Sequence, residues 1–542
     1  MPITSFLESN AHKFGSDCAL VEVNPEMRHS TAAWNEAELV ETDRHPGYRK
    51  TLSWAEFDTQ ANHFANLLIS RGVKKGDKVA ILLMNCIEWL PVYFGTLKVG
   101  ALAVPLNFRY ASDEIRYCLD LADVFALIFG AEFITRMEAI QGEIPNVRLQ
   151  FFLGDGCPTF AEDCLQLTAG QSADKPNVQI CDKDDAAIYF SSGTTGFPKA
   201  ILHSHAGLVS ACVTEQAHHG QTKDDVFLCI PPLYHTGAKM HWFGSLIVGG
   251  RAVLLRGATP QWIVETAASE KASVIWLLVP WAQDILDAIE SGEIDLTQMD
   301  LSAWRLMHIG AQPVPPSLVK RWQSIFPNHA YDTNYGLSES LGPGAVHLGI
   351  ENVRKVGAIG VAGHGWQTRI VNERGEDIPR GKVGELAVKG PGVMRCYYKD
   401  EAATAAVLRG DWLFTGDMAK QDEEGFIYLV DRKKDVIITG GENLYPVQIE
   451  DFLRAHPKIK DVAVIGLPDH RLGEIACAII EIKPGFTANE GEMMEFCAAL
   501  PRYKRPRRIV FDTVPRNPTG KIEKPRLRKK YVGESLVEQQ IR

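Results

Sequence analysis

The sequence predicts an α/β fold, with a large N-terminal α/β body of several subdomains and a small mobile α+β C-terminal domain. Three observations lead to this prediction. Continuous apolar runs, typical of strands covered on both faces, alternate with segments of helical periodicity. The chain has 542 residues, more than a single hydrophobic core organises. After Asp417 the segments become shorter and more polar, and two basic clusters follow at 502–508 and 521–530.

The segment 52–105 shows the alternation most clearly. Ser53 and Glu56 form a capping-box pattern, which predicts that a helix begins there. Apolar side chains then recur at helical spacing from Phe57 to Leu68 and therefore share one core face. The next predicted elements are a strand, a helix and a strand at 79–84, 87–99 and 101–105. Further strands are predicted at 186–190, 226–230, 252–255 and 274–279.

We place a domain boundary between residues 431 and 432. A polar turn at 421–425 is followed by a short apolar strand, 426–430, and by the densely charged segment 431–435. Such a change in composition, from a polar turn to a densely charged segment, is typical of a link between two domains. The sequence therefore predicts an N-terminal domain of residues 1–431 and a C-terminal domain of residues 432–542.

Bulk composition argues against several classes of protein. Acidic residues (67) exceed basic ones (57), which argues against a nucleic-acid partner. The 11 cysteines form no C-x-x-C pair and have no histidine at zinc-finger spacing, so we expect neither a disulfide framework nor a structural zinc site, and a reducing compartment fits. Without an apolar signal segment or a run long enough to span a bilayer, we expect a cytoplasmic protein with no integral membrane association.

A glycine-rich segment at 191–199, S-S-G-T-T-G-F-P-K, directly follows the predicted strand 186–190. Glycines let the backbone approach an anion, hydroxyls and N–H groups donate hydrogen bonds, and Lys199 adds positive charge, so the segment suits phosphate. An ordinary Ser/Thr/Gly surface turn is the alternative. A P-loop is excluded because Pro198 precedes the lysine and Ala200 follows it.

This segment resembles the signature of the adenylate-forming superfamily, which contains acyl-CoA synthetases, firefly luciferase and the adenylation domains of peptide synthetases. Six further segments resemble that superfamily's motifs and occur in its order. They are P-P-L-Y-H-T-G at 231–237, Y-G-L-S-E at 335–339, the segment 412–417, D-R-K-K-D at 431–435, G-G-E-N-L-Y-P at 440–446 and N-P-T-G-K at 517–521.

The resemblance implies site residues for ATP, Mg²⁺ and coenzyme A. The implied catalytic residues are Lys521, His235 and Glu339, and the implied Mg²⁺ ligands are Glu339 and Thr194. Asp417 and Arg432 fall at the ribose contacts, and Lys434 falls at the hinge of the mobile domain. The implied nucleotide- and CoA-binding residues are Ser191, Ser192, Gly193, Thr194, Thr195, Gly196, Lys199, Gly310, Ala311, Asp332, Asn334, Tyr335, Ser338, Asp417, Arg432, Lys434, Gly440, Gly441 and Glu442.

The activity implied is that of an AMP-forming acid–CoA ligase, which first converts a carboxylate and ATP to acyl-AMP and pyrophosphate and then passes the acyl group to CoA. Acetate-specific relatives carry a tryptophan after the adenine-stacking aromatic residue, whereas this chain has Gly336. We therefore expect an acid larger than acetate, of medium size and aliphatic, alicyclic or aromatic. The expected acyl-site lining is apolar and consists of Trp242, Trp281, Met240, Ala238 and Leu341.

Other functions stay open at this point. An amino-acid-activating enzyme that loads a carrier protein usually offers a carboxylate to the substrate ammonium, and 231–250 contains no Asp or Glu. Luciferase-like chemistry and a non-catalytic nucleotide-binding protein are further alternatives, whereas a dinucleotide-binding oxidoreductase fails because 357–360 departs from G-x-G-x-x-G. Taken singly, His235, Glu339 and Lys521 are ordinary turn or surface residues. The oligomeric state is not determined, and a homodimer is one candidate.

Overall fold

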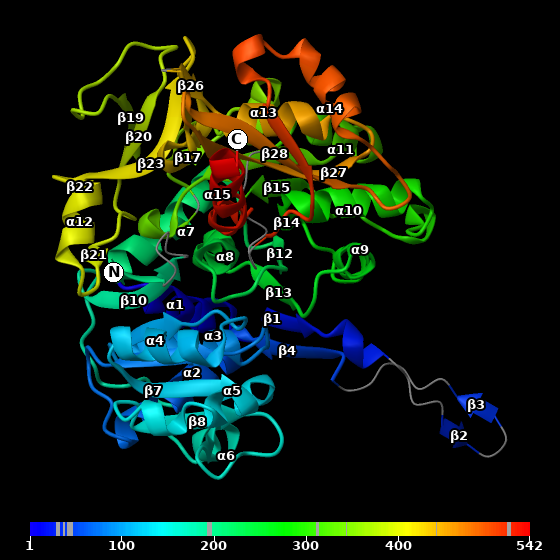
Figure 1. Cartoon of the computed structure of the whole chain (residues 1–542). Coiled ribbons are helices and arrows are strands. Elements are labelled where there is room, and N and C mark those ends of the chain that lie inside the picture. The colour runs from blue at the N-terminus through cyan, green and yellow to red at the C-terminus, as the bar shows by residue number, and fades with distance from the viewer. Residues whose placement is uncertain are drawn as a thin grey trace.

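The computed structural model describes residues 1–28, 33–35, 38–40, 47–191, 198–310, 314–342, 344–440, 442–516 and 522–541, and describes side chains in these ranges except at Arg28, 33–35, 38–40, His241 and 533–541. It confirms the α/β class. Figure 1 shows two large sheets below and behind a C-terminal part in which helix α15 (Lys524–Ile541) lies across the middle of the view.

The first sheet has eight strands and is parallel in its central part. Its order is β21 (Cys396–Tyr397), β11 (Lys199–Ser204), β10 (Asp185–Ser191), β6 (Leu102–Pro105), β5 (Lys78–Leu82), β7 (Val124–Gly130), β8 (Leu149–Leu153) and β9 (Glu162–Asp163). The strands from β10 to β9 are parallel, and β11 and β21 continue the sheet antiparallel. Its helices are α2 (Trp54–Ser70), α3 (Trp89–Lys98), α4 (Ser112–Leu121), α5 (Ile134–Glu138) and α6 (Cys164–Ala169).

The second sheet has nine strands. Its order is β18 (Val361–Ala362), β17 (Val346–His347), β16 (Ala330–Tyr335), β15 (Leu306–Gly310), β14 (Val274–Leu278), β12 (Val226–Cys229), β13 (Arg251–Leu255), β1 (Cys18–Val23) and β4 (Arg49–Ser53). The strands from β16 to β1 run parallel. Its helices are α1 (Thr4–Phe14), α7 (His205–His219), α8 (Thr236–Val248), α9 (Pro260–Ser269), α10 (Val279–Glu290) and α11 (Pro316–Ile325).

Two smaller sheets complete the chain, together with a hairpin of β2 (Ala33–Asn35) and β3 (Glu38–Val40). One contains β19 (Gln367–Val371), β20 (Gly384–Lys389), β23 (Trp412–Gln421), β22 (Leu408–Arg409) and β24 (Ile427–Arg432), beside α12 (Glu401–Val407). The other contains β26 (Glu442–Leu444), β25 (Ile437–Thr439), β28 (Gly473–Ile482), β27 (Ile459–Asp469) and β29 (Arg508–Phe511), with α13 (Pro446–Arg454), α14 (Glu490–Phe496) and α15. Short 3₁₀ helices are η1 (Pro25–Arg28), η2 (Ala131–Phe133), η3 (Gln141–Glu143), η4 (Leu296–Gln298), η5 (Ser338–Ser340), η6 (Ile350–Lys355), η7 (Lys433–Asp435), η8 (Cys497–Ala499) and η9 (Arg502–Lys504).

The largest hydrophobic cluster joins the two large sheets. It contains buried side chains from α1, α2, α3, α7 and α8 together with strands of both sheets, so these helices form a shared layer between them. In the part of the chain that the structure describes, no hydrophobic cluster contains residues from both sides of position 431. The predicted domain boundary stays a prediction, and this separation of the cores supports it.

The local predictions in the N-terminal body are confirmed. Ser53 caps α2, its hydroxyl accepting from the Glu56 N–H and the Glu56 carboxylate accepting from the Ser53 N–H. The apolar face from Phe57 to Leu68 is buried. The strands predicted around residues 79, 101, 186, 226, 252 and 274 are β5, β6, β10, β12, β13 and β14. Among the described residues, no helix combines the length and the apolar character needed to cross a membrane.

Candidate active site

The glycine-rich segment connects two antiparallel strands. Ser191, the last residue of β10, pairs with Lys199, the first residue of β11, so both ends of the loop are held side by side. Residues 192–197 lie outside the described part of the chain, and with them the predicted contacts Ser192, Gly193, Thr194, Thr195 and Gly196. The ammonium group of Lys199 lies 4.5 Å from the centre of the Tyr397 ring on β21, the strand next to β11.

Glu339 lies at the hydroxyl end of Tyr397. The Tyr397 hydroxyl donates to Glu339 Oε1 at 2.8 Å, and burial, aided by this carboxylate, raises the pKa of Tyr397, which keeps the donor protonated. The carbonyl of the neighbouring Ser338 lies 2.8 Å from His203 Nε2. The structure thus brings Lys199 and Glu339 together around Tyr397. Tyr397 is 58 positions from Glu339 and carries no local motif, so the sequence alone does not mark it as a site residue.

Three predicted nucleotide residues meet where β16, β23 and β24 approach one another. The Tyr335 hydroxyl donates to Asp417 Oδ2 at 2.6 Å, and Asp417 Oδ1 lies 3.4 Å from Arg432 Nε. Asp417 and Arg432 are also direct partners in the β23–β24 ladder. Burial raises the pKa of Tyr335, while the charge of Asp417 raises the pKa of Arg432. These three side chains form one polar group, in which the Asp417 carboxylate is buried and Arg432 is partly exposed.

Gly310 and Asn334 lie at the carboxyl ends of β15 and β16, the usual place for ligands in parallel sheets. A Cβ on Gly310 would lie 3.6 Å from Asn334 Oδ1, which is an ordinary contact, so packing at this edge does not require glycine. Ala311 lies outside the described residues. Asp332 is fully buried, with His219 Nε2 2.9 Å from Oδ2 and the Gly349 N–H donating to Oδ1 at 2.8 Å. This placement favours an indirect role for Asp332, in which it positions β16.

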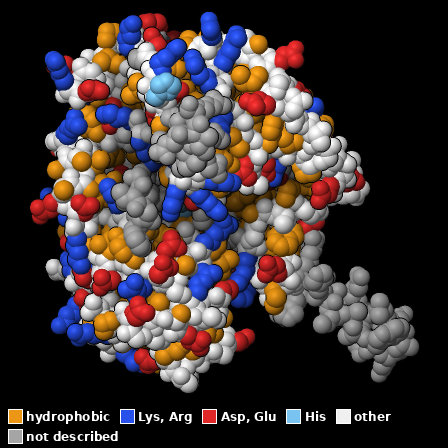
Figure 2. Space-filling view, in the orientation of Figure 1, with side chains coloured by type: hydrophobic (Ala, Val, Ile, Leu, Met, Phe, Trp, Pro, Cys, Tyr) orange, Lys and Arg blue, Asp and Glu red, His pale blue; other side chains and the backbone are white. Residues whose placement is uncertain are grey.

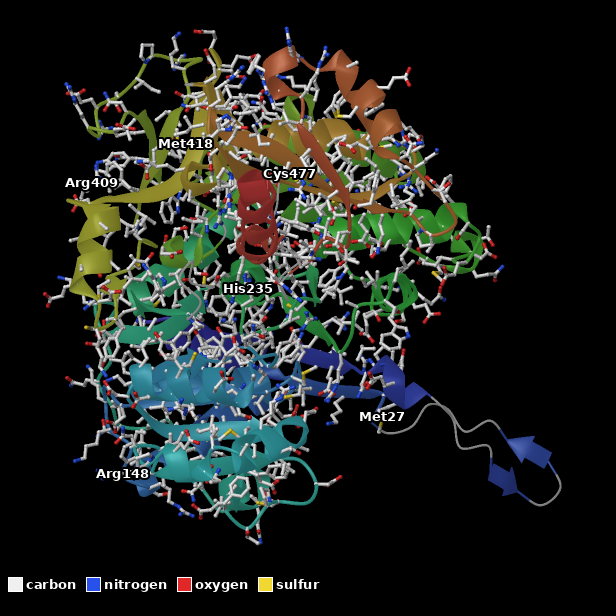
Figure 3. All side chains as sticks on the ribbon, in the orientation of Figure 1. Met27, Arg148, His235, Arg409, Met418 and Cys477 are labelled. Carbon is white, nitrogen blue, oxygen red and sulfur yellow. The ribbon has the colours of Figure 1, made fainter. Side chains whose placement is uncertain are left out.

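His235 caps the helix that carries most of the predicted acyl lining. Its Nδ1 accepts from the Gly237 N–H at 3.1 Å at the start of α8, and Figure 3 places it in the middle of the molecule. Tyr234 beside it packs edge-on against Phe108 at 5.5 Å between ring centres. Among the expected lining residues, Trp281 is partly exposed; the buried ones are Ala238, Met240, Trp242 and Leu341.

The predicted hinge lies in η7, between β24 and β25. Lys434 is exposed in this turn, and the next residue, Asp435, accepts from Arg528 Nη2 of α15 at 2.7 Å. Gly440 has a positive φ of 59° and donates its N–H to the Leu472 carbonyl, while Glu442 is exposed on β26. Gly441 and Lys521 lie outside the described residues.

Asp431, on β24, links this strand to the C-terminal part. Its carboxylate accepts from the backbone N–H groups of Arg432 at 2.7 Å and of Val447, at the start of α13, at 2.9 Å. Burial outweighs these bonds and the charge of Lys524, and raises the pKa of Asp431 to about 6. The folded protein therefore binds a proton more readily than the unfolded chain does.

Stability from this proton is present at low pH and is lost as the pH rises through about 6. Between about pH 5 and pH 7.5 the wild type should lose about 1.4 kcal/mol of unfolding free energy relative to Asp431→Asn, which does not titrate. Thermal midpoints of both proteins across this range measure the effect. Asp411→Asn, at an exposed carboxylate of the same sheet, is the control and should parallel the wild type. A constant difference between wild type and Asp431→Asn would contradict the assignment.

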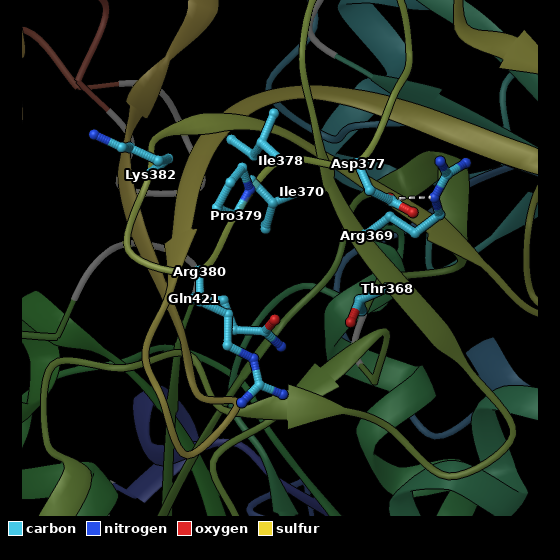
Figure 4. A pocket seen from close by; sticks show the side chains of 9 residues that line it. All are labelled: Thr368, Arg369, Ile370, Asp377, Ile378, Pro379, Arg380, Lys382 and Gln421. Carbon is cyan, nitrogen blue, oxygen red and sulfur yellow. Dashed lines mark hydrogen bonds and ion pairs between the residues drawn. The ribbon is translucent and has the colours of Figure 1, made fainter.

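A distinct polar pocket of about 220 Å³ lies at the edge of the sheet that contains β19 and β23 (Figure 4). The ion pair of Arg369 Nε and Asp377 Oδ1, 2.6 Å apart, lies on its rim. None of the predicted site residues lines it.

Figure 2 shows Lys and Arg side chains gathered in the middle of the face where the C-terminal part meets the body, although the net charge of the chain is −10. This placement of positive charge suits polyanionic ligands.

Comparison with known proteins shows the family of the chain. A family model for AMP-binding enzymes matches residues 28–398, and a model for the C-terminal domain of AMP-binding enzymes matches residues 448–521. The chain belongs to the AMP-binding enzyme family. Its adenylate-forming fold is shared with the anthranilate CoA ligase AuaEII in complex with anthranoyl-AMP, at a TM-score of 0.86 and 24% identity over 98% of this chain and 97% of that one. ATP-bound MatB from Rhodopseudomonas palustris matches at a TM-score of 0.85 and 27% identity over 98% of this chain and 99% of that one.

Curated AMP-binding relatives are CoA ligases. The long-chain-fatty-acid–CoA ligase FadD13 of Mycobacterium tuberculosis is 32% identical over 89% of this chain and 93% of the relative. The indoleacetate–CoA ligase of Aromatoleum aromaticum is 30% identical over 92% and 98%, and a feruloyl-CoA synthase of Amycolatopsis is 31% identical over 90% and 95%. This AMP-binding enzyme is accordingly an ATP-dependent acid–thiol ligase, with a carboxylic acid, ATP and CoA as substrates.

Proposed function

We propose that this ligase activates a medium-sized aliphatic, alicyclic or aromatic carboxylic acid, larger than acetate, through an acyl-adenylate. The observation that supports the route best is the meeting of two groups of predicted residues around one region: Lys199 and Glu339 at Tyr397, and Tyr335 and Arg432 at Asp417. The first group suits phosphates and the second suits a nucleoside. Together they fit the two ends of ATP.

Each residue then has a role set by its charge. A carboxylate oxygen attacks the α-phosphorus and pyrophosphate leaves, so negative charge gathers on the phosphoryl oxygens. Lys199 and the loop that it closes bind the departing phosphates, and Lys521 meets the carboxylate and the α-phosphate. Asp417 accepts from the ribose hydroxyls while Tyr335 lies against the adenine. In the second step the CoA thiol attacks the acyl carbonyl, loses its proton, and AMP leaves.

Glu339 is chemically suited to hold Mg²⁺ together with Thr194. Mg²⁺ prefers carboxylate and hydroxyl oxygens and keeps several waters, which a partly exposed carboxylate permits. One Glu339 oxygen accepts from Tyr397, and this bond fixes the direction of the other. When bound, Mg²⁺ neutralises phosphate charge.

Removal of the Tyr397 hydroxyl should weaken the use of Mg²⁺. In Tyr397→Phe the Glu339 carboxylate loses its positioning bond, and the Mg²⁺ concentration for half-maximal rate should rise about 10-fold. Tyr398→Phe is a matched control, because that hydroxyl donates to the exposed Asp123 instead. Mg²⁺ titrations at saturating ATP measure the difference. The same Mg²⁺ dependence in both variants would count against Glu339 as a ligand.

The size of the acid is the part of the proposal that Gly336 supports. This residue directly follows Tyr335, where a tryptophan would close the acyl site, and the helix behind His235 is apolar. The named substrates of the relatives, a long-chain fatty acid, indoleacetate and ferulate, are all larger than acetate. One chain supplies every predicted site residue, so the proposed activity does not require a homodimer. A cytoplasmic location would supply ATP and CoA.

A panel of acids tests the proposal. Pyrophosphate release should be fastest with hexanoate to decanoate or with phenylacetate and cinnamate, and acyl-CoA should form when CoA is present. Gly336→Trp should reduce rates with the larger acids about 100-fold or more, as expected when a bulky side chain overfills an apolar site, while sparing acetate. Fastest turnover with acetate in the wild type would refute the acid class, and turnover that does not depend on CoA would refute thioester formation.

We further propose that residues 432–542 rotate about Lys434 between the two half-reactions. The separate hydrophobic cores and the exposed turn at η7 support a movable joint. In one orientation the 517–521 segment would face the phosphates. In the other, the segment from Gly440 to Glu442 would replace it beside CoA.

A further inference from the structure

Five buried titratable side chains lie together beside the middle of β15 and β16, where His308 and Asp332 are partners in the strand register. Glu215 and His219 come from the last turns of α7, His308 from β15, Asp332 from β16 and His347 from β17. All five side chains are 0% exposed. Glu215 and His219 are one helical turn apart, so both point to the same side of α7.

The distances between these side chains match those of ligands that share one metal ion. Glu215 Oε2 lies 3.2 Å from His219 Nδ1 and 3.9 Å from His308 Nδ1, and the three donor atoms lie within 4.8 Å of one another. Donors around a tetrahedral Zn²⁺ at its usual bond lengths are about 3.3 Å apart. His347 Nε2 lies 3.3 Å from the other Glu215 oxygen and is the nearest candidate for a fourth ligand.

In two of the histidines, the ring nitrogen that faces away from Glu215 contacts a carboxylate. The non-ligating nitrogen of a histidine at a metal site usually makes such a contact. Asp332 Oδ2 lies 2.9 Å from His219 Nε2 and 3.2 Å from His347 Nδ1. If Asp332 accepts from these nitrogens, the protons sit there, and the opposite nitrogens present lone pairs toward Glu215. His219 Nδ1 and His347 Nε2 are both buried and face Glu215 oxygens at 3.2 Å and 3.3 Å, but neither is well aligned for a hydrogen bond to them. Two lone pairs facing a carboxylate call for a cation between them.

The two buried carboxylates of the cluster also require a positive charge nearby. Glu215 and Asp332 place two carboxylates in the interior, where negative charge must be balanced. A divalent ion bound by neutral imidazoles balances both. Protons on two of the histidines would also do so, and the experiment below separates these accounts.

We propose that Glu215, His219 and His308 bind a divalent transition-metal ion, for which their nitrogen and oxygen donors make Zn²⁺ the best suited, and that Asp332 orients His219 from outside. The ion would tie α7 to β15, an inner strand of the nine-stranded sheet. Asn334 Nδ2 donates to Glu215 Oε1 at 3.1 Å, so the ion would also hold the end of β16 in place. This site is separate from Glu339, and the proposal does not depend on the acid that the ligase activates.

Metal analysis of the intact chain tests the proposal. Protein purified without chelator should contain one Zn²⁺ per chain by elemental mass spectrometry. After metal removal, it should rebind Zn²⁺ in competition with a chromophoric chelator, and Co²⁺ should give the visible absorption of a low-coordinate site. His219→Gln and His308→Gln should each lower the Zn²⁺ affinity about 100-fold or more, because each removes a ligand.

Two variants serve as controls. His205→Gln changes another buried histidine of α7 outside the cluster, and Glu339→Gln changes the proposed Mg²⁺ ligand, so both should keep the Zn²⁺ affinity of the wild type. Equal Zn²⁺ binding by His219→Gln, His308→Gln and the wild type would overturn the proposal. If the ligand variants do not fold, metal binding by the wild-type protein tests the proposal. A folded wild-type chain that binds neither Zn²⁺ nor Co²⁺ would overturn it and would mean that protons on the histidines balance the carboxylate charges.

Discussion

Replacement of Lys521 by alanine should slow acyl-adenylate formation by about 10²–10³-fold, because a donor aimed at developing phosphoryl charge contributes about 3–4 kcal/mol in a water-poor site. Thioester formation from supplied acyl-AMP should be nearly unchanged, since the lysine is proposed to leave before CoA reacts. Pyrophosphate release measures the first half-reaction, and acyl-CoA formation from synthetic acyl-AMP measures the second.

The segment that contains Lys521 is anchored by residues on both sides, and this makes the test with Lys521→Ala selective. Arg516 and Ile522, on either side of 517–521, form a β-bridge, and Lys524 lies 2.8 Å from the buried Glu450. Loss of the Lys521 side chain therefore leaves these anchors intact. Lys529→Ala, at an exposed lysine of α15, is the matched control and should keep both half-reactions. Equal loss of both half-reactions in Lys521→Ala would refute the alternation of the C-terminal domain.

Asp417→Ala should raise the KM for ATP about 100-fold. The carboxylate is buried between the Tyr335 hydroxyl and Arg432 Nε, and its removal leaves two polar groups without their partner in addition to the lost ribose contact. Truncation of one member of such a hydrogen-bonded charged group costs about 3 kcal/mol, which corresponds to roughly that factor. Initial rates at varied ATP, with the acid and CoA saturating, measure it.

Two further variants separate binding from folding. Asp417→Asn keeps an acceptor for Tyr335 but removes the charge near Arg432, so its KM should lie between those of the wild type and Asp417→Ala. Asp377→Ala breaks an exposed pair with Arg369 on β19 of the same sheet and should change neither KM nor stability appreciably. A KM for ATP in Asp417→Ala that equals the wild-type value would remove Asp417 from the nucleotide site.

The tertiary structure changes how several predicted residues are understood. Asp332 resembles a nucleotide contact in the sequence, yet it is buried among histidines, which favours an indirect role in positioning β16. Tyr397, which no motif marks, joins Lys199 to Glu339. The predictions that fall on 192–197, Ala311, Gly441 and Lys521 rest on the motifs alone.

The sequence by itself determined the features that depend on neighbours along the chain. The capping box at Ser53 and Glu56, the apolar face that follows it and the strand before the glycine-rich loop are all local, because helix and strand periods repeat within a few residues. The ordered motifs likewise identified the family before any fold was known.

Only the tertiary structure decided which distant side chains meet. Tyr335 reaches Asp417 across 82 positions, and the cluster of Glu215, His308 and His347 joins a helix to two strands. Spacing along the chain suggested no structural zinc site, because it could not reveal a cluster built from separate elements. The reason is physical: strand order and register, which depend on the packing of the whole sheet, set these distances.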